Sequence, residues 1–291
     1  MFSGSIVALI TPLQNGQVDY DAIKALVEWQ IAEGSSGIVA CGSTGESHLL
    51  TAAEYEKIVA TCVAAAVGRV PVIAGAGCIG TAETLEQIKQ AEKAGAEALL
   101  VVTPAFVRPS QAGLFEHYKK LSESTALPII LYDNPGRAGV SLADDTIYKL
   151  AQFKNIVGLK DASGITERPI DHRLHLGNDF ALLCGDQIIA AAYFAGGGDG
   201  CISMPANVAP RLCAELHNAW QVQDLVLFQK ISQKLHPLNK AMCIESNPLP
   251  IKYAVSKLGK CCNELRSPLM PISKESERIV DKAMEIAGVN K

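Results

Sequence analysis

Eight short apolar runs alternate with helical segments between residues 6 and 203 of this 291-residue chain. Between the runs, apolar residues recur at helical spacing, and Thr51 with Glu54 predicts a capping box at one helix start. Short apolar strands separated by helices are typical of a parallel sheet covered by helices, and eight such units fit a closed barrel. The sequence therefore predicts an α/β fold, a (β/α)8 TIM barrel. Its strands are expected at residues 6–10, 37–41, 70–74, 98–102, 127–132, 157–161, 180–184 and 200–203.

The pattern changes after residue 207, where the strand-like runs stop. Four helical segments are expected from there on, at 209–220, 224–243, 248–258 and 274–287. We expect a catalytic barrel over residues 1–224 and a C-terminal helical region over residues 225–291. A doubly wound open sheet is the alternative fold, but the Gly-x-Gly-x-x-Gly turn of such sheets is missing after the first run.

Composition restricts the partners and the compartment. The formal net charge of −4 argues against a nucleic-acid partner, which would favour a basic stripe. No apolar run reaches the roughly 18 residues needed to span a membrane, and the first residues lack the basic segment of a signal peptide. The nine cysteines form no Cys-x-x-Cys pair, as is typical of reduced thiols. We therefore expect a cytoplasmic protein with no membrane partner.

Lys160 is unusual because it ends an otherwise apolar strand. Removing an ammonium from water is costly, so lysine is rarely buried without a partner. One interpretation is a lysine whose ammonium reaches solvent along an apolar stem. The other is an uncharged amine that attacks a carbonyl carbon. Because chemistry in a (β/α)8 barrel occurs at the carboxyl ends of the strands, the position of Lys160 allows the second interpretation.

Three other groups are predicted at the same end of the barrel. Tyr132 ends the fifth run, and its phenol can pass a proton. The Gly/Ser/Thr turn at 42–47 can direct N–H and hydroxyl groups at a small anion. Arg137 offers a guanidinium suited to a carboxylate. A core-edge tyrosine, an ordinary loop or a surface arginine would look the same in isolation, but together with Lys160 they form a Schiff-base constellation for a 2-oxo acid.

Further motifs lie along the whole chain, at residues 42–47, 102–104, 108–111, 132–137, 158–161, 200–203, 206–210 and 247–252. Together they resemble those of the 4-hydroxy-tetrahydrodipicolinate synthase (dihydrodipicolinate synthase) family, within the pyruvate-dependent class I aldolase superfamily. The resemblance implies a TIM barrel with a C-terminal helical extension. It implies a lyase that condenses pyruvate with L-aspartate 4-semialdehyde in the diaminopimelate route of lysine biosynthesis. It also implies no metal or organic cofactor, and a homotetramer built as a dimer of dimers.

The same resemblance implies roles for particular residues. Lys160 would form the imine with pyruvate, and Tyr132 would shuttle protons during imine and enamine formation. Thr44 would hold the pyruvate carboxylate, with the main chain of Ile202 nearby. Arg137 would bind the carboxylate of the aldehyde substrate.

The chain departs from the family at the proton relay. Ser43 stands where a threonine is usual, and Phe106 stands where the family has a tyrosine that reaches a neighbouring subunit. Ser43 keeps a hydroxyl, but a water would have to replace the hydroxyl that Phe106 lacks. Two alternatives therefore stay open: a lyase for a sugar-derived 2-oxo acid, similar to N-acetylneuraminate lyase, and a small-molecule-binding barrel with weakened catalysis. A metal site on His172 and His175, which have near-helical spacing, is a third.

A second departure concerns feedback by lysine. In lysine-inhibited members of the family, polar side chains bind lysine at a dimer interface. Ser47 and Glu83 keep that chemistry here. The usual polar partners are replaced by Ala52, Tyr55, Ile79 and Ala105. We therefore expect weak or absent inhibition by L-lysine.

Overall fold

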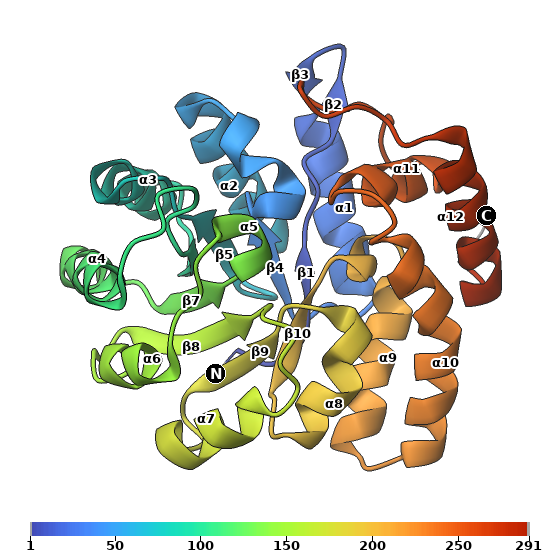
Figure 1. The fold of residues 1–291 in the computed structure, drawn as a ribbon. Coiled ribbons are helices and arrows are strands. Elements are labelled where there is room, and N and C mark those ends of the chain that lie inside the picture. The colour runs from blue at the N-terminus through green and yellow to red at the C-terminus, as the bar shows by residue number, and fades with distance from the viewer. Residues whose placement is uncertain (1, 290–291) are drawn as a thin grey trace.

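The computed structural model describes residues 2–289 and contains eight parallel strands closed into a barrel (Figure 1). Neighbours hydrogen-bond in the order β1, β10, β9, β8, β7, β6, β5, β4, and β4 pairs with β1 to close the ring. This confirms the (β/α)8 barrel and excludes the open doubly wound sheet. The strands are β1 (Gly4–Ala8), β4 (Gly37–Ala40), β5 (Val72–Ala76), β6 (Ala98–Val102), β7 (Ile129–Asp133), β8 (Ile156–Asp161), β9 (Ala181–Cys184) and β10 (Gly200–Ser203).

Helices surround the barrel (Figure 1). The predicted capping box is present at the start of α2, where the Thr51 hydroxyl accepts from the Glu54 N–H and the Glu54 carboxylate accepts from the Thr51 N–H. The hairpin of β2 (Leu13–Gln14) and β3 (Gln17–Val18) was not predicted, since two-residue strands show no periodicity. The helices that follow the barrel strands are α1 (Tyr20–Ala32), α2 (Ala52–Ala66), α3 (Thr81–Lys93), α4 (Gln111–Ser124), α5 (Pro135–Ala138), α6 (Asp144–Leu150), α7 (Arg168–Leu176), α8 (Ala190–Ala195) and α9 (Pro210–Gln221).

Three of the strands begin two residues away from their predicted starts, β1 earlier and β5 and β7 later. Glycine accounts for the early start of β1 and for the continuation of β5 beyond its predicted end. β1 begins at Gly4, which pairs with Gly200; a side chain on Gly200 would lie 2.5 Å from the Gly4 carbonyl oxygen. β5 continues through Gly75, where a Cβ would clash with the Cys41 carbonyl oxygen. Glycine is needed where two backbones approach this closely. A prediction based on hydropathy alone assigns such glycines to loops and therefore misses these strand residues.

Alternate residues of each strand face either the barrel interior or the surrounding helices. Ile130 and Tyr132 belong to the interior core, whereas Leu131 and Leu159 belong to the core between strands and helices. The same alternation puts Lys160 in the interior, one residue beyond Leu159. Tyr132 and Lys160 therefore both face inward near the carboxyl end of the barrel.

The C-terminal helices α10 (Leu225–Ala241), α11 (Leu249–Lys257) and α12 (Lys274–Ala287) follow the barrel. The Asp224 carboxylate accepts from the Leu227 N–H at 3.0 Å and caps α10, so we propose the boundary of the helical region after residue 224. The fully buried Lys252 of α11 lies 2.5 Å from the carboxylate of Glu46. Because Glu46 belongs to the loop after β4, this ion pair ties the helical region to the carboxyl end of the barrel.

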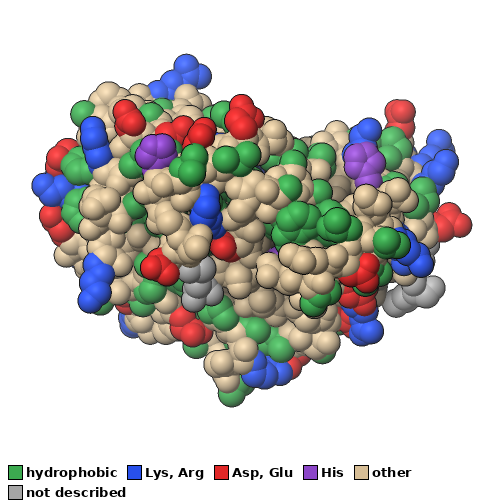
Figure 2. Space-filling view, turned by 90° about the horizontal axis from the view of Figure 1, so that it is seen from below, with side chains coloured by type: hydrophobic (Ala, Val, Ile, Leu, Met, Phe, Trp, Pro, Cys, Tyr) green, Lys and Arg blue, Asp and Glu red, His purple; other side chains and the backbone are tan. Residues whose placement is uncertain are grey.

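The surface and the thiols bear on the expected partners. Acidic and basic side chains are interspersed on the face shown in Figure 2 and do not gather into a basic stripe. All nine cysteines are free thiols. Among residues 2–289, no helix has both the length and the apolar character that crossing a bilayer requires.

His117 on α4 makes the stability of the fold depend on pH. Its side chain is 5% exposed, and burial lowers the pKa of the imidazole from 6.5 to about 4. As the pH falls, the unfolded chain therefore binds this proton at a higher pH than the folded chain does. The contribution of neutral His117 to the free energy of unfolding is fully present above pH 6.5 and is lost as the pH falls towards 4. The loss amounts to about 3 kcal/mol.

We expect His117→Gln, which does not titrate in this range, to reduce the acid loss of unfolding free energy by about that amount. Urea unfolding curves at neutral and acidic pH measure it. Parallel pH dependence in the variant and the parent would show that His117 is not the group responsible.

Candidate active site

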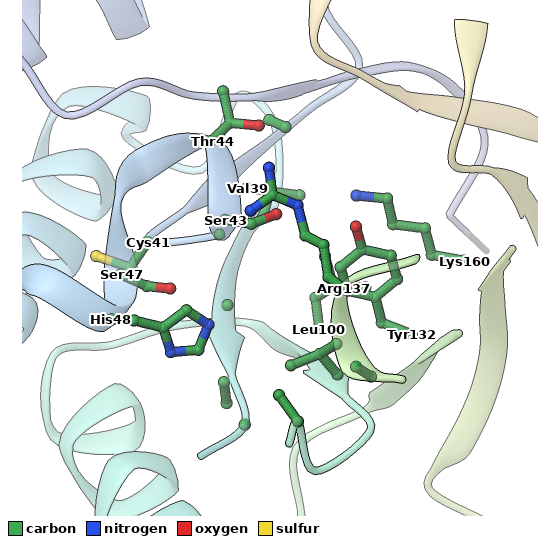
Figure 3. A pocket seen from close by; sticks show the side chains of 18 residues that line it. Val39, Cys41, Ser43, Thr44, Ser47, His48, Leu100, Tyr132, Arg137 and Lys160 are labelled. Atoms are coloured by element: carbon green, nitrogen blue, oxygen red, sulfur yellow. The ribbon is translucent and has the colours of Figure 1, made fainter. Parts of the chain in front are cut away.

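One pocket opens at the carboxyl end of the barrel, and its empty space, which includes open solvent at the mouth, is about 580 Å³. Lys160, Tyr132 and Arg137 line it from β8, β7 and α5. Ser43 and Thr44 line it from the turn after β4. Figure 3 shows the Tyr132 hydroxyl and the Lys160 amine pointing into the same part of the pocket, with the turn opposite them. The structure therefore brings together five of the seven site residues predicted from the sequence.

Lys160 and Tyr132 are neighbours across paired strands. β7 and β8 pair in register at these two residues, whose side chains are 5% and 7% exposed. Lys160 Nζ lies 4.0 Å from the centroid of the Tyr132 ring. An amine in contact with a phenol and open to a pocket has the geometry needed to attack a carbonyl carbon and exchange protons nearby.

Tyr132 carries a phenol whose acidity is set by its neighbours. Burial raises its pKa, but the charge of Lys160 and hydrogen bonds to the phenol oxygen outweigh burial, so the pKa lies below the usual value of 10. One of these hydrogen bonds comes from Asn134 Nδ2, which donates to the phenol oxygen at 2.8 Å. A phenol of lowered pKa passes protons more readily near neutral pH. Asn134 was given no role from the sequence, although it lies two residues after Tyr132.

The turn that carries Ser43 and Thr44 is held by a buried carboxylate. Glu46 ends the turn with a φ of +55°, in the left-handed region. Its carboxylate lies 2.5 Å from Lys252 Nζ and accepts from the Arg266 N–H at 3.0 Å. These contacts fix the last residue of the turn, which presents a half-buried serine and a buried threonine to the pocket.

Asn247 joins the two groups predicted to hold carboxylates. Arg137 Nη2 donates to the Asn247 carbonyl at 2.8 Å, and Asn247 Nδ2 donates to Thr44 Oγ1 at 3.1 Å. Because Thr44 accepts this hydrogen bond, its own hydroxyl proton can be donated to a ligand. Asn247 lies 110 residues after Arg137, so its motif was visible in the sequence but its place in the site was not.

Phe106 and Ile202 are not among the residues that line this pocket in the described part of the chain. Phe106 is 89% exposed, with a φ of +74°, and its side chain lies on the surface. Ile202 is fully buried in the interior core on β10. The role predicted for Phe106 involves a neighbouring subunit, and the role predicted for Ile202 involves its main chain. Both roles therefore stay predictions.

The histidines proposed as a metal site contact an aromatic ring instead. The His172 ring meets Tyr148 edge-on at 5.7 Å, and His175 stacks on Tyr148 at 4.4 Å. Within residues 2–289, no three side chains of metal-binding type are gathered to hold an ion. The structure thus gives no support to the metal alternative.

Comparison with known proteins identifies the relatives of this chain. The 4-hydroxy-tetrahydrodipicolinate synthase of Bradyrhizobium diazoefficiens is 46% identical over 288 residues, which are 99% of this chain and 97% of that protein. The crystal structure of dihydrodipicolinate synthase from Aquifex aeolicus matches with a TM-score of 0.97 at 39% identity, covering 99% of both chains. The lysine-bound enzyme of Cyanidioschyzon merolae matches with a TM-score of 0.96 at 32% identity, again over 99% of both chains. Residues 1–287 match the sequence model of the dihydrodipicolinate synthetase family, and the chain therefore belongs to that family.

Proposed function

We propose that this protein is a lyase that condenses pyruvate with L-aspartate 4-semialdehyde to 4-hydroxy-tetrahydrodipicolinate, in the diaminopimelate route of lysine biosynthesis. The observation that carries the proposal is the contact of the Lys160 amine with the Tyr132 ring at the mouth of a barrel that belongs to this family. The names of the relatives favour the synthase over the sugar-acid lyase.

The chemistry proposed for the site needs only groups of the protein itself. The Lys160 amine attacks the ketone carbon of pyruvate, water leaves, and the resulting iminium acts as the electron sink. Loss of a methyl proton then gives an enamine, whose carbon attacks the aldehyde. Tyr132 carries protons in both steps, while Thr44 and the Ile202 main chain hold the pyruvate carboxylate. The amine of the product closes the ring and displaces Lys160.

Product formation tests this assignment. The enzyme incubated with pyruvate and L-aspartate 4-semialdehyde is expected to consume both substrates and release the cyclic product. A parallel incubation with N-acetylneuraminate is expected to release no pyruvate. Turnover of the sugar acid without turnover of the semialdehyde would reject the synthase and favour the lyase.

We propose that Arg137 selects the aldehyde through its carboxylate. Its guanidinium is exposed, and a hydrogen bond to the Asn247 carbonyl holds it at the pocket. From this position the guanidinium can contact a substrate carboxylate. Loss of such a charge-assisted contact costs roughly 1.5–3 kcal/mol, so Arg137→Ala is expected to lower kcat/KM for the aldehyde about 10- to 150-fold. Pyruvate trapping should be largely kept.

The matched control for this prediction is Arg211→Ala. Arg211, on α9, pairs at 2.6 Å with Glu33, which directly follows α1. Neither residue lines the pocket. This control should retain the parent kcat/KM. An unchanged aldehyde preference in Arg137→Ala would show that the second carboxylate is bound elsewhere and would favour the sugar-acid lyase.

We infer a cytoplasmic homotetramer, a dimer of dimers, from the family resemblance and the free thiols. Phe106 and Val107 are 89% and 52% exposed in the single chain, as expected of residues that reach a neighbouring chain. Phe106 offers no hydroxyl to that neighbour. The relay proposed for this protein is therefore Tyr132, Ser43 and a water.

We expect weak or no inhibition by millimolar L-lysine. A second pocket contains the family's lysine-binding positions other than Ala105, which lines the active-site pocket. Among them, Ala52 and Ile79 offer lysine no polar partner. Tyr55 is buried and donates its hydroxyl to the Gly75 carbonyl at 3.0 Å. Each unsatisfied polar group costs about 1–3 kcal/mol, and two or three such losses remove a millimolar site. Turnover with and without lysine decides this, and inhibition at sub-millimolar lysine would contradict it.

A further inference from the structure

Two buried carboxylates lie directly after the two proposed catalytic side chains. β7 and β8 pair in register at Tyr132 and Lys160, and the next pair along the strands is Asp133 with Asp161. These aspartates are 0% and 2% exposed. By strand alternation they face the surrounding helices, on the opposite side of the barrel wall from the pocket. Two like charges on adjacent strands repel each other, and burial strengthens the repulsion.

Arg168, the first residue of α7, lies between these two carboxylates and offsets their repulsion. It is 4% exposed, and its Nη1 donates to Asp133 Oδ2 at 2.7 Å and lies 3.4 Å from Asp161 Oδ1. Its Nε donates to Asp144 Oδ1 at 2.8 Å, and its Nη2 donates to the Leu142 carbonyl at 2.6 Å. One guanidinium nitrogen thus contacts the carboxyl ends of both catalytic strands.

The two aspartates extend the clamp to the segments that follow the strands. Asp133 also accepts from the Ser141 hydroxyl at 2.7 Å and from the Leu142 N–H at 3.1 Å. Ser141 and Leu142 come shortly after α5, the helix that carries Arg137. Asp161 accepts from the Ser163 N–H at 2.8 Å, which closes a turn directly after Lys160.

We propose that Arg168 is a positioning residue for the Schiff-base reaction, because its bridge from Asp133 to Asp161 holds Tyr132 and Lys160 in the register that the reaction needs. The proposal rests on the function proposed above. Arg168 itself does not line the pocket and touches no reacting atom. A purely structural role would lower stability alone, whereas a positioning role lowers the rate of chemistry in folded protein.

Arg173 is the matched control for a stabilising arginine. It lies on the same helix, and its Nη2 donates to Asp199 Oδ2 at 2.8 Å and to the Gly197 carbonyl at 2.6 Å. Its Nη1 lies within hydrogen-bond distance of the Phe180 carbonyl at 3.2 Å. Asp199 and Phe180 precede β10 and β9, so Arg173 clamps the amino ends of strands, opposite the active site.

The experiment compares Arg168→Met with Arg173→Met in the full-length enzyme, at a temperature well below both melting points. The readouts are the melting temperature, the rate of borohydride-trapped pyruvate adduct formation, kcat, and KM for the aldehyde. A misplacement of reacting groups by about 1 Å can cost on the order of 100-fold in rate. We expect Arg168→Met to lose about 10- to 100-fold in adduct rate and kcat, with KM for the aldehyde changed by less than about threefold. Arg173→Met should lose stability and keep its kcat.

Arg168→Lys decides the question if Arg168→Met does not fold. A single ammonium keeps the charge but cannot reproduce the fixed fork of a guanidinium, so we expect an intermediate loss of adduct rate. The double variant Arg168→Met/Asp161→Asn, which removes one of the repelling charges, should recover part of the lost rate. The proposal is overturned if folded Arg168→Met has the same adduct rate and kcat as the parent enzyme. If only Arg168→Lys folds, the same result in that variant overturns it. Absence of a Lys160 adduct in the parent enzyme would instead reject the proposed function, so the two failures are distinguishable.

Discussion

Replacement of Lys160 by alanine is expected to abolish the borohydride-stable pyruvate adduct and to reduce turnover to background. In the parent enzyme, one reduced pyruvate imine should appear per chain, and peptide mapping should place it on Lys160. The reason is covalent: without this amine, no iminium forms to stabilise the carbanion, and the remaining groups at the pocket cannot substitute for it. The expected effect exceeds that of any other substitution considered.

Lys252 provides an internal control for this mapping. It is as well buried as Lys160, but it lies 2.5 Å from Glu46 Oε1 and donates to the Glu264 carbonyl at 2.6 Å. It does not line the pocket. Burial alone therefore does not mark a reactive lysine, and an adduct on Lys252 or on any other lysine would refute the mechanism.

The position of Lys160 could be predicted because the sequence encodes it locally. An apolar run that ends in lysine places the side chain at the carboxyl end of a strand, and eight such runs specify the barrel whose carboxyl end carries the chemistry. The same reasoning placed Tyr132, which the structure pairs in register with Lys160. The helices α5 and α8 were not predicted because they are too short to show a clear helical period.

Contacts between site residues that lie far apart in the sequence could not be predicted. Asn247 reaches Thr44 and Arg137 only because the helical region folds back over the barrel, and hydrophobic periodicity carries no information on such packing. The aspartates after Tyr132 and Lys160 were visible as a repeated pattern at two strand ends. Their meaning depends on Arg168, whose position at the start of a short polar helix gave no periodic signal.

Tyr132→Phe is expected to lower kcat by about 10²- to 10⁴-fold, the usual contribution of a general acid–base group. The substitution removes one hydroxyl and leaves the ring against which Lys160 Nζ lies at 4.0 Å, so the amine should stay in place. The adduct should therefore still form on Lys160, but more slowly, because water must leave the carbinolamine without the phenol proton. Borohydride trapping at short times separates this slow formation from a lost nucleophile.

Tyr118→Phe is the matched control for the missing hydroxyl. Tyr118 is fully buried and donates its hydroxyl to the Val101 carbonyl at 3.0 Å, in the core between strands and helices. Its replacement leaves a buried carbonyl without this donor, which costs about 1–3 kcal/mol of stability, but it should not change kcat. If Tyr132→Phe retained the parent kcat and trapping rate, the protons would travel through Ser43 and water alone. The lowered pKa of Tyr132 would then reflect the charge of Lys160 and the hydrogen bonds to its phenol oxygen, without any part in catalysis.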